Sequence, residues 1–432
     1  MSIEPSETDP RIAPRVSAGL DRALLHQFFD LRSSYNVMMG GGYADDPYPV
    51  WSELRSSGPV HEGIVHELTG FDGPAMFQGL PFPDRRHFSA FSYSACDAAF
   101  RNERLFASSH EPIDPNADEG LQTSMLYMGG VQHRRYRTLV QPSFVPVRAK
   151  WWIERWIEST VHSLIDGFVE DGQAELNVDF CAAIPVLTIT GSFGVPIDQA
   201  LAVRAALRPG APNGENSLVA ILAPIVAARR NTTEDDLISV LVSSEMTDED
   251  GTVHRLSDAE IYSFAALLLA AGSGTTWKQM GIVLSALLSR PAVLDVIRED
   301  RSLVPVAIEE SLRWSPTDPM FSRFVTEDTE FFGTKLTAGS VLHLCLGAAN
   351  RDPERWDDPD TYDVQRPSRP SLGFGSGPHI CLGMHVARAE MSVALNALLD
   401  RLPNLRLDPA ASLPRMIGMY ERGVTEIPVV WN

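Results

Sequence analysis

The sequence lacks both a long basic run and a long apolar run. Its 36 Lys and Arg residues stand against 56 Asp and Glu residues, a formal net charge of −20 over 432 residues. Phosphate binding needs clustered basic side chains, so the composition argues against a nucleic-acid-binding protein. No stretch reaches the roughly 18 to 20 consecutive apolar residues of a membrane span, and residues 1–9 are acidic where a secretory signal is basic and then apolar. We therefore expect a cytoplasmic protein with no membrane span.

Cysteine is also scarce. The chain has four, which lie far apart without a C-x-x-C pair: Cys96, Cys181, Cys345 and Cys381. This spacing excludes a dense disulfide framework and a four-cysteine zinc or iron–sulfur site. A single thiolate ligand remains possible.

The periodicity of the chain predicts a mainly α protein with a small β region. Residues 1–20 lack apolar periodicity and contain three prolines, which is typical of a mobile arm. Short apolar runs with Gly and Pro over 54–106 predict a small sheet, and helices dominate from residue 132, with further strands near 323–332 and 340–346. The strongest helical signal covers 258–289. Its centre, 264–271, is apolar on every face, which indicates the axis of a large soluble core.

The sharpest local feature is a glycine-rich loop, residues 374–383, with the sequence F-G-S-G-P-H-I-C-L-G. It places Cys381 at the start of a helix expected over 383–402. Helix N-termini depress a thiol pKa and donate hydrogen bonds to a sulfur that carries charge, as a metal-bound thiolate does. A buried structural cysteine is the alternative. A dinucleotide-binding loop at 373–377 is disfavoured, because no strand precedes it and the order is not G-x-G-x-x-G.

This loop resembles the cysteine-ligand signature of the cytochromes P-450, F-x-x-G-x-x-x-C-x-G. The resemblance implies that Cys381 is the axial thiolate ligand of a haem b iron and favours O–O cleavage. It also implies that Phe374 packs near the sulfur, that Gly383 completes the haem-binding loop, and that His379 faces a haem propionate. The implied fold is the triangular, mainly α cytochrome P-450 fold, with 21–432 as a single catalytic domain.

Two further segments agree with this family. Glu310 and Arg313 resemble its E-x-x-R motif, in which the pair shares a helix face and binds a later arginine, here Arg366. Alone, the motif would be an ordinary surface pair. His133 and Arg137 lie at i and i+4, and the resemblance makes them propionate partners together with His379 and Arg323.

The central helix carries A-G-S-G-T-T at residues 271–276, which resembles the family's oxygen-binding element A-G-x-[D/E]-T-T. The resemblance implies that Gly272 opens the helix over the iron and that Thr275, next to Thr276, hydrogen-bonds the oxygen species. An ordinary kink at Gly and Ser is the alternative. Gly274 stands where the family has an acid, and glycine cannot perform acid–base work. Water chains through the threonines, a polar group of the substrate, or hydrogen peroxide as oxidant could each replace the acid, and we rank water first.

The interval 197–228, where the family places two lid helices over its substrate channel, is short in this chain. A short lid predicts an open site unless the loop 108–124 compensates. Candidates for a substrate pocket, chosen by their position in the family's pattern, are Met125, Leu126, Ala270, Ala271, Thr275, Met320, Phe321, Ile417 and Met419. Such residues are more often plain core.

The implied function is haem-thiolate monooxygenation, in which dioxygen is activated and one oxygen atom enters a hydrophobic organic substrate. The chain length leaves no room for a fused reductase beside this fold, so we expect a ferredoxin and its reductase as electron donors. A ferredoxin is generally acidic, so docking on this acidic chain needs a local basic patch, with Arg134 and Arg135 as candidates. Two alternatives remain: a peroxide-dependent haem enzyme, favoured by Gly274, and a non-catalytic haem-binding protein.

Overall fold

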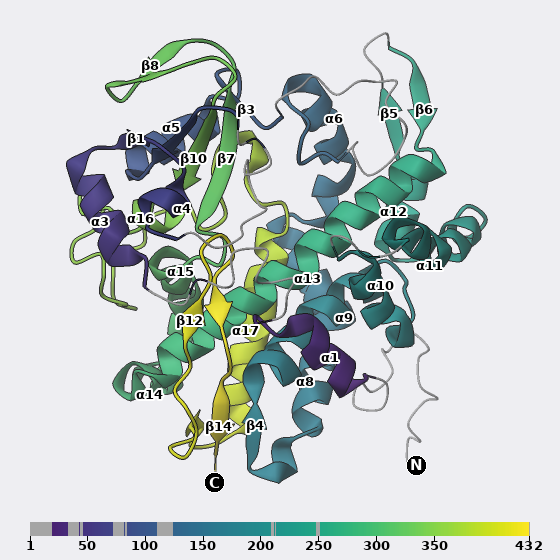
Figure 1. The fold of residues 1–432 in the computed structure, drawn as a ribbon. Coiled ribbons are helices and arrows are strands. Elements are labelled where there is room, and N and C mark those ends of the chain that lie inside the picture. Colours follow the sequence, from purple (N-terminus) through teal and green to yellow (C-terminus); the bar gives the residue numbers. More distant parts are fainter. Residues whose placement is uncertain are drawn as a thin grey trace, which may run out of the picture.

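The computed structural model describes residues 20–32, 43, 46–71, 82, 84–109, 124–208, 211, 213–247 and 251–431. Within these residues the chain is mainly helical with several small sheets, as the sequence predicts (Figure 1). The expected mobile arm, residues 1–20, lies outside the described residues except for residue 20.

The described helices, in chain order, are α1 (Arg22–Phe29), α3 (Tyr48–Ser57), α4 (Val65–Leu68), α5 (Tyr93–Arg101), α6 (Gly130–Val140), α7 (Ala149–Trp152), α8 (Glu158–Asp166), α9 (Ala183–Ser192), α10 (Ala200–Ala206), α11 (Gly214–Arg229), α12 (Leu237–Ser243), α13 (Asp258–Leu288), α14 (Pro291–Glu299), α15 (Val304–Trp314), α16 (Leu346–Ala349) and α17 (Met384–Arg401). The described strands are β1 (Val60–Glu62), β2 (His87–Ala90), β3 (Phe106–Ala107), β4 (Gln173–Glu175), β5 (Glu245–Thr247), β6 (Val253–Arg255), β7 (Met320–Val325), β8 (Thr329–Phe331), β9 (Thr334–Leu336), β10 (Val341–Cys345), β11 (Arg406–Leu407), β12 (Met416–Ile417), β13 (Gly423–Val424) and β14 (Pro428–Val430).

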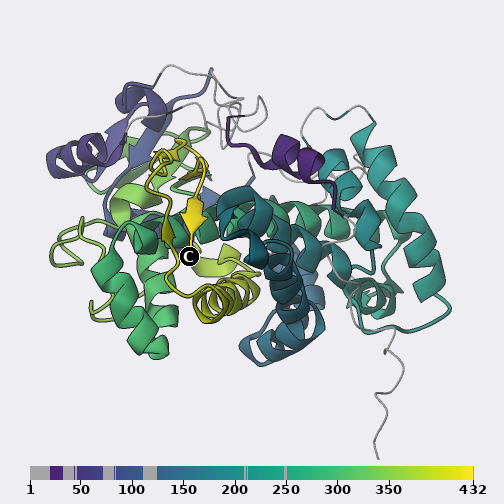
Figure 2. The same ribbon diagram turned by 90° about the horizontal axis from the view of Figure 1, so that it is seen from below.

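The largest sheet joins distant parts of the chain. Its strand order is β1-β2-β10-β7-β3, with β10 parallel to β2 and the other neighbours antiparallel. Strands from the first quarter of the sequence therefore pair with strands that follow α15. The sheet forms the β-rich region at the upper left of Figure 1, while α8 to α12 lie on the other side of the molecule. Figure 2 shows the same division from below.

Helix α13 is the axis of the fold and crosses the molecule between these two parts (Figure 1). It begins with the capping box that the sequence predicts, since Ser257 accepts the Glu260 backbone N–H while the Glu260 side chain accepts from the Ser257 backbone. Most of its residues are buried, including Trp277 and Lys278. The helix is continuous over 31 residues, so its middle is held rigidly between α9 and the C-terminal strands.

The short helix α1 packs onto the core beside α10. Asp179 accepts hydrogen bonds from Arg22 at 2.8 Å and 2.6 Å, and His26 Nε2 lies 2.8 Å from the same carboxylate. Phe29 is fully buried and meets the Trp277 ring edge-on, with centroids 5.0 Å apart. The Arg204 guanidinium of α10 lies 5.0 Å from the Phe29 ring centroid. Helix α1 therefore connects the N-terminal segment to both α10 and α13.

The two helices expected as a lid are both present, and the first is short. Helix α10 has seven residues and α11 has sixteen, and the connection between them is described only in part. Most of the loop expected to compensate, residues 110–123, lies outside the described residues. The short interval predicted by the sequence thus corresponds to a short α10, with α1 packed beside it.

In the part of the chain that the structure describes, no single helix has the length and apolar composition needed to cross a membrane. Two helix pairs reach that composition only when joined across sharp bends of 119° and 100°, namely Asn177–Ser192 with Ile197–Ala206 and α13 with α14.

Candidate haem site

The cysteine loop is fixed by glycines at positions where no other residue fits. The Cys381 backbone N–H donates to the Phe374 carbonyl at 2.9 Å, which closes the loop. Gly377 has φ +71°, and a Cβ there would lie 2.4 Å from the Phe100 carbonyl oxygen. A Cβ on Gly373 would lie 2.8 Å from the Leu312 carbonyl oxygen. Close packing therefore requires glycine at positions 373 and 377 of the loop that places Cys381 just before α17.

Cys381 is embedded in the molecule yet retains accessible surface, whereas the other three cysteines are buried. Burial raises the pKa of the Cys381 thiol, while a hydrogen bond from the Gly383 backbone and the charges of Arg137 and Arg388 lower it. The Arg388 guanidinium also lies 4.7 Å from the centroid of the Phe374 ring. Gly383 thus lies beside the sulfur, and Phe374 is joined to residue 381 through its backbone carbonyl.

The middle of α13 has the accessible surface expected of a helix that lines a hollow. Ala270 and Ala271 are exposed and Thr275 is half-buried, although the turns on both sides of them are buried. Accessible surface in the centre of the axial helix and at Cys381 leaves a face on each element that a bound flat cofactor would cover.

A cluster of cations and histidines lies next to the cysteine loop. The rings of His133 and His379 stack with centroids 3.9 Å apart, and Arg137 Nη2 donates to the Ile380 carbonyl at 2.8 Å. Arg323 is buried, and burial lowers its pKa to about 10. Burial, followed by the nearby His133, Arg323 and Arg137, lowers the pKa of His379 to about 3. The structure therefore brings together all four residues expected to bind haem propionates.

This cluster fits a carboxylate-bearing cofactor on its own chemistry. His133 Nδ1 is buried and has no hydrogen-bond partner, which is costly unless a ligand supplies one. Glu103, which the motifs did not single out, lies 3.4 Å from His379 Nε2 and accepts the Gly130 backbone N–H at 2.9 Å. Only the fold brings Glu103 to this place, because it belongs to the turn after α5. The unpartnered His133 Nδ1, the neighbouring arginines, Cys381 and the accessible face of α13 together fit haem.

The oxygen-binding element of α13 differs in detail from the expectation. The helix is continuous, so the opening expected at Gly272 is absent. A Cβ on Gly272 would lie 2.9 Å from Ile189 Cγ1, so this glycine allows α9 to pack closely against α13. Thr275 Oγ1 donates to the Ala271 carbonyl at 3.1 Å, while Thr276 is buried.

Gly274 faces the buried arginine of α10. A Cβ on Gly274 would lie 3.7 Å from both Nη1 and Nη2 of Arg204, an ordinary van der Waals distance. Arg204 Nη1 also donates to Ser273 Oγ at 3.1 Å. An acidic side chain at position 274 would therefore meet a guanidinium in a buried setting, although this chain has none there.

The E-x-x-R residues form a buried ion cluster rather than a surface pair. Arg313 donates to both carboxylate oxygens of Glu310 at 2.7 Å, and Arg366 Nε donates to Glu310 Oε1 at 3.2 Å. Arg313 also donates to the carbonyls of Asn350 and Pro359. The cluster joins α15 to the segment that leads to the cysteine loop, as the motif predicts.

The predicted pocket residues separate into two groups. Ala270, Ala271 and Leu126 are exposed, and Phe321 and Thr275 are half-buried, so these five have accessible surface. Met125 and Ile417 are buried in the large core that includes α13, and Met320 and Met419 are fully buried in a separate core with Trp51. Met320 and Met419 are therefore core residues, because β7 and the turn after β12 pack them against α3.

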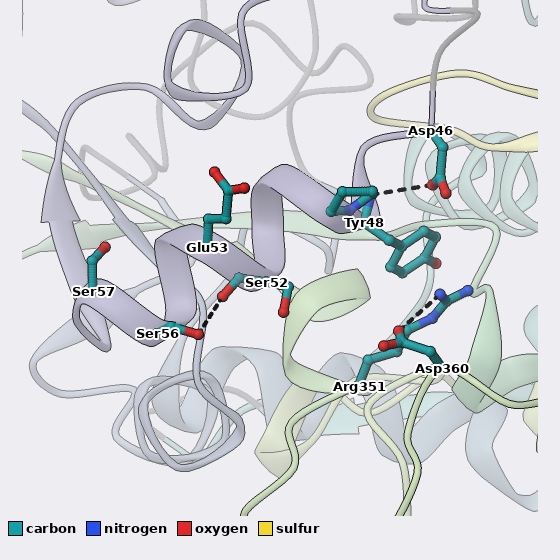
Figure 3. A pocket seen from close by; sticks show the side chains of 9 residues that line it. Asp46, Tyr48, Ser52, Glu53, Ser56, Ser57, Arg351 and Asp360 are labelled. Atoms are coloured by element: carbon teal, nitrogen blue, oxygen red, sulfur yellow. Dashed lines mark hydrogen bonds and ion pairs between the residues drawn. The ribbon is translucent and has the colours of Figure 1, made fainter.

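A surface hollow lies away from all of these residues. It is lined by α3 and the segment after α16, with Asp46, Tyr48, Ser52, Arg351 and Asp360 around it (Figure 3). None of the predicted site residues lines it, so it is no part of the candidate haem site.

Comparisons with known proteins identify the class that this fold and site define. The family model described as cytochrome P-450 matches residues 216–415. Cytochrome P-450 monooxygenase PikC of Streptomyces venezuelae is 31% identical over 91% of this chain and 93% of its own length. The biotin biosynthesis cytochrome P-450 of Bacillus subtilis is 32% identical over 90% of this chain and 97% of its own. A solved structure of P450BioI in complex with an acyl carrier protein superposes with a TM-score of 0.76 at 27% identity, covering 90% of this chain and 99% of that one.

The chain belongs to the cytochrome P-450 family. It has the family's fold and is a monooxygenase, an oxidoreductase with oxygen incorporation. The family uses a haem-thiolate cofactor and needs both a redox partner and a substrate.

Proposed function

We propose that this protein binds haem b with Cys381 as the axial ligand and inserts one oxygen atom into a hydrophobic organic substrate, with electrons from a ferredoxin and its reductase. The observation that supports this most directly is the place of Cys381, which keeps accessible surface just before α17 and lies next to a cluster of arginines and histidines. The carbon monoxide difference spectrum of the reduced protein tests it, and a strongly red-shifted Soret band is the expected result.

In this proposal the chain's residues hold the cofactor and control protons. The bound haem supplies the activation of dioxygen. The Gly383 backbone N–H and the Arg388 charge stabilise negative charge on the Cys381 sulfur. His133, Arg137, Arg323 and His379 bind the propionates. On α13, the Thr275 hydroxyl, which donates to the Ala271 carbonyl at 3.1 Å, would hold a proton that it can exchange with water.

The absence of an acid at position 274 can be tested by placing an aspartate there. We expect Gly274→Asp to fold, because a Cβ there makes only ordinary contacts and the carboxylate would pair with Arg204. If proton supply limits turnover, the fraction of consumed O2 that appears as product rises several-fold, since general acid–base catalysis contributes about a hundredfold or more where a group is positioned for it. Product and peroxide are measured per O2 consumed.

Gly274→Ala serves as the matched control for the added side chain, because it adds Cβ without an acid. A rise in Gly274→Ala as large as in Gly274→Asp would contradict the role of the carboxylate.

Peroxide-dependent oxidation is the second candidate, and the glycine at position 274 favours it. Hydrogen peroxide brings both oxygen atoms and protons, so an enzyme that uses it has less need of an acid. Turnover with peroxide alone that exceeds turnover with O2 and any electron donor would favour this candidate.

The proposed electron donor leads to a prediction about the surface of α6. Arg134 is exposed and Arg135 half-buried on the same helix that carries His133 and Arg137. We expect reversal of both to Glu to slow reduction by an acidic ferredoxin at least tenfold at low salt, since complementary charge mainly sets association rates. Stopped-flow reduction and substrate-induced spectral titration measure the two effects.

An unchanged substrate Kd in the Arg134→Glu, Arg135→Glu variant is part of this prediction. Reversal of Arg406, which is exposed on β11, is the control. Equal losses in reduction and substrate binding would refute docking at α6.

A further inference from the structure

Three charged side chains from separate parts of the chain meet beside the middle of α13. Lys278 belongs to α13 and is only 2% exposed, and it forms an ion pair with Glu421, which precedes β13. Asp318, in the connection between α15 and β7, is the third member, because the preceding Thr317 is hydrogen-bonded to Gln279, next to Lys278, and to Arg422, next to Glu421. None of the three belongs to the motifs that identify the family.

The neighbouring residues along the chain fix this cluster in place. The Thr317 backbone N–H donates to Gln279 Oε1 at 2.9 Å, which ties the segment before β7 to α13. Thr317 Oγ1 donates to the Arg422 carbonyl at 2.9 Å, and the Arg422 N–H donates to the Thr317 carbonyl at 2.7 Å. Each bonded residue is adjacent in sequence to one member of the cluster. Hydrogen bonds of the adjacent residues therefore hold this segment in place, and they do not depend on the ion pairs of the charged side chains.

The charges of the cluster do not balance. Two carboxylates face one ammonium, and Lys278 is already paired with Glu421. Among the described residues, none donates a hydrogen bond to the Asp318 carboxylate. Burial, reinforced by Glu421 and opposed by Lys278, raises the pKa of Asp318 to about 7. A cationic group that meets this carboxylate would stabilise its negative charge.

The position of Asp318 is beside the candidate haem site. The residue before it, Thr317, donates its backbone N–H to Gln279 Oε1, and Gln279 follows Thr275 by four residues on α13. Lys278 follows Thr275 by three residues, almost one turn along α13. Asp318 is half-buried and retains accessible surface, while Thr317 and Pro319 on either side are buried. Its side chain is thus the accessible polar group of this segment.

We propose that Asp318 is a specificity-determining residue of the substrate pocket, whose carboxylate binds a basic amino group on an otherwise apolar substrate. This inference rests on the proposed function, because it places the substrate beside the haem. Lys278 neutralises Glu421 and leaves Asp318 as the carboxylate that pairs with the ligand. The substrate class is therefore an apolar molecule that carries a cationic amine.

A matched pair of ligands tests the charge preference. Benzyltrimethylammonium carries a fixed positive charge and cannot coordinate iron through nitrogen, and 2,2-dimethylpropylbenzene is its neutral isostere. We expect the ratio of their dissociation constants to favour the cation in the unmodified holoprotein, and to shift at least tenfold against the cation in Asp318→Asn. Charge-assisted contacts of partly buried groups are large enough for this. Calorimetry measures both constants at pH 8, where most Asp318 is ionised.

Two variants keep the test decisive. Asp318→Glu retains the charge and should recover part of the preference, while Asp46→Asn removes one exposed carboxylate and should leave the ratio unchanged. An unchanged ratio in Asp318→Asn would overturn the proposal. The carbon monoxide difference spectrum of each variant reports the haem site separately. A normal spectrum together with an unchanged ratio of dissociation constants in Asp318→Asn refutes only the amine subsite. A missing red-shifted Soret band in the unmodified protein refutes the proposed function. In that case calorimetry still measures the ratio of dissociation constants.

Discussion

Replacement of Cys381 by alanine is expected to abolish the strongly red-shifted Soret band of the reduced, carbon monoxide-bound protein and all O2-dependent product formation. The thiolate is the donor that gives the haem this spectrum and favours O–O cleavage. Cys381 retains accessible surface, and its thiol receives a hydrogen bond from the Gly383 backbone and lies in range of the Arg137 and Arg388 charges. Alanine leaves the loop intact, because the bond from the residue 381 N–H to the Phe374 carbonyl does not involve the side chain.

Cys96→Ala is the matched control for this variant. Cys96 is fully buried in α5, and burial raises the pKa of its thiol well above the usual range, so it is not a thiolate donor. The control should keep both the red-shifted band and turnover. A red-shifted band that persists in Cys381→Ala would disprove the ligand assignment.

Glu310→Ala is expected to lower the free energy of unfolding by about 3–5 kcal/mol, the cost of leaving buried charges without their partner. Glu310 and Arg313 are 5% and 3% exposed at their side chains, and Arg366 shares the same carboxylate. The carboxylate also accepts the Asp363 backbone N–H at 2.9 Å. Its removal leaves two guanidinium groups without their carboxylate partner and one backbone donor without its acceptor, in the segment that leads to the cysteine loop.

The adjacent Glu309 provides a control on the same helix. Its side chain is 44% exposed and pairs with Arg388, which is 34% exposed. Because exposed pairs contribute about 0–1 kcal/mol, Glu309→Ala should change the unfolding free energy by no more than that. Chemical denaturation of both variants, followed by circular dichroism, measures the difference. Equal losses in the two variants would show that the buried cluster has no special role in stability.

Local motifs predicted the parts of the site whose chemistry depends on neighbours in the chain. The loop around Cys381 needs glycine where its backbone passes within contact distance of Phe100 and Leu312. These glycines are part of the sequence motif itself. The capping box of α13 and the pair of Glu310 with Arg313 are equally local, since each joins residues three apart. The sequence therefore located the thiol, the axial helix and the ion pair.

Other features depend on contacts between residues far apart in the chain. Gly272 was expected to open α13, but its missing side chain makes room for Ile189 of α9, 83 positions earlier in the sequence. Met320 and Met419 were expected in the pocket, yet the fold packs them in a core with Trp51. Side-chain identity gave no signal for either outcome, because methionine suits a pocket and a core equally well.

What the sequence determined by itself is the family, the mainly α fold with its small sheet, and the residues of the haem-binding motifs, because helix periodicity and short motifs act over a few residues. Only the tertiary structure decided which groups meet around that site. It placed Glu103 beside His379, Arg204 beside Gly274, and the segment of Asp318 beside the residues next to Lys278 and Glu421. Such contacts follow from how helices and loops pack, so no short stretch of the sequence contains them.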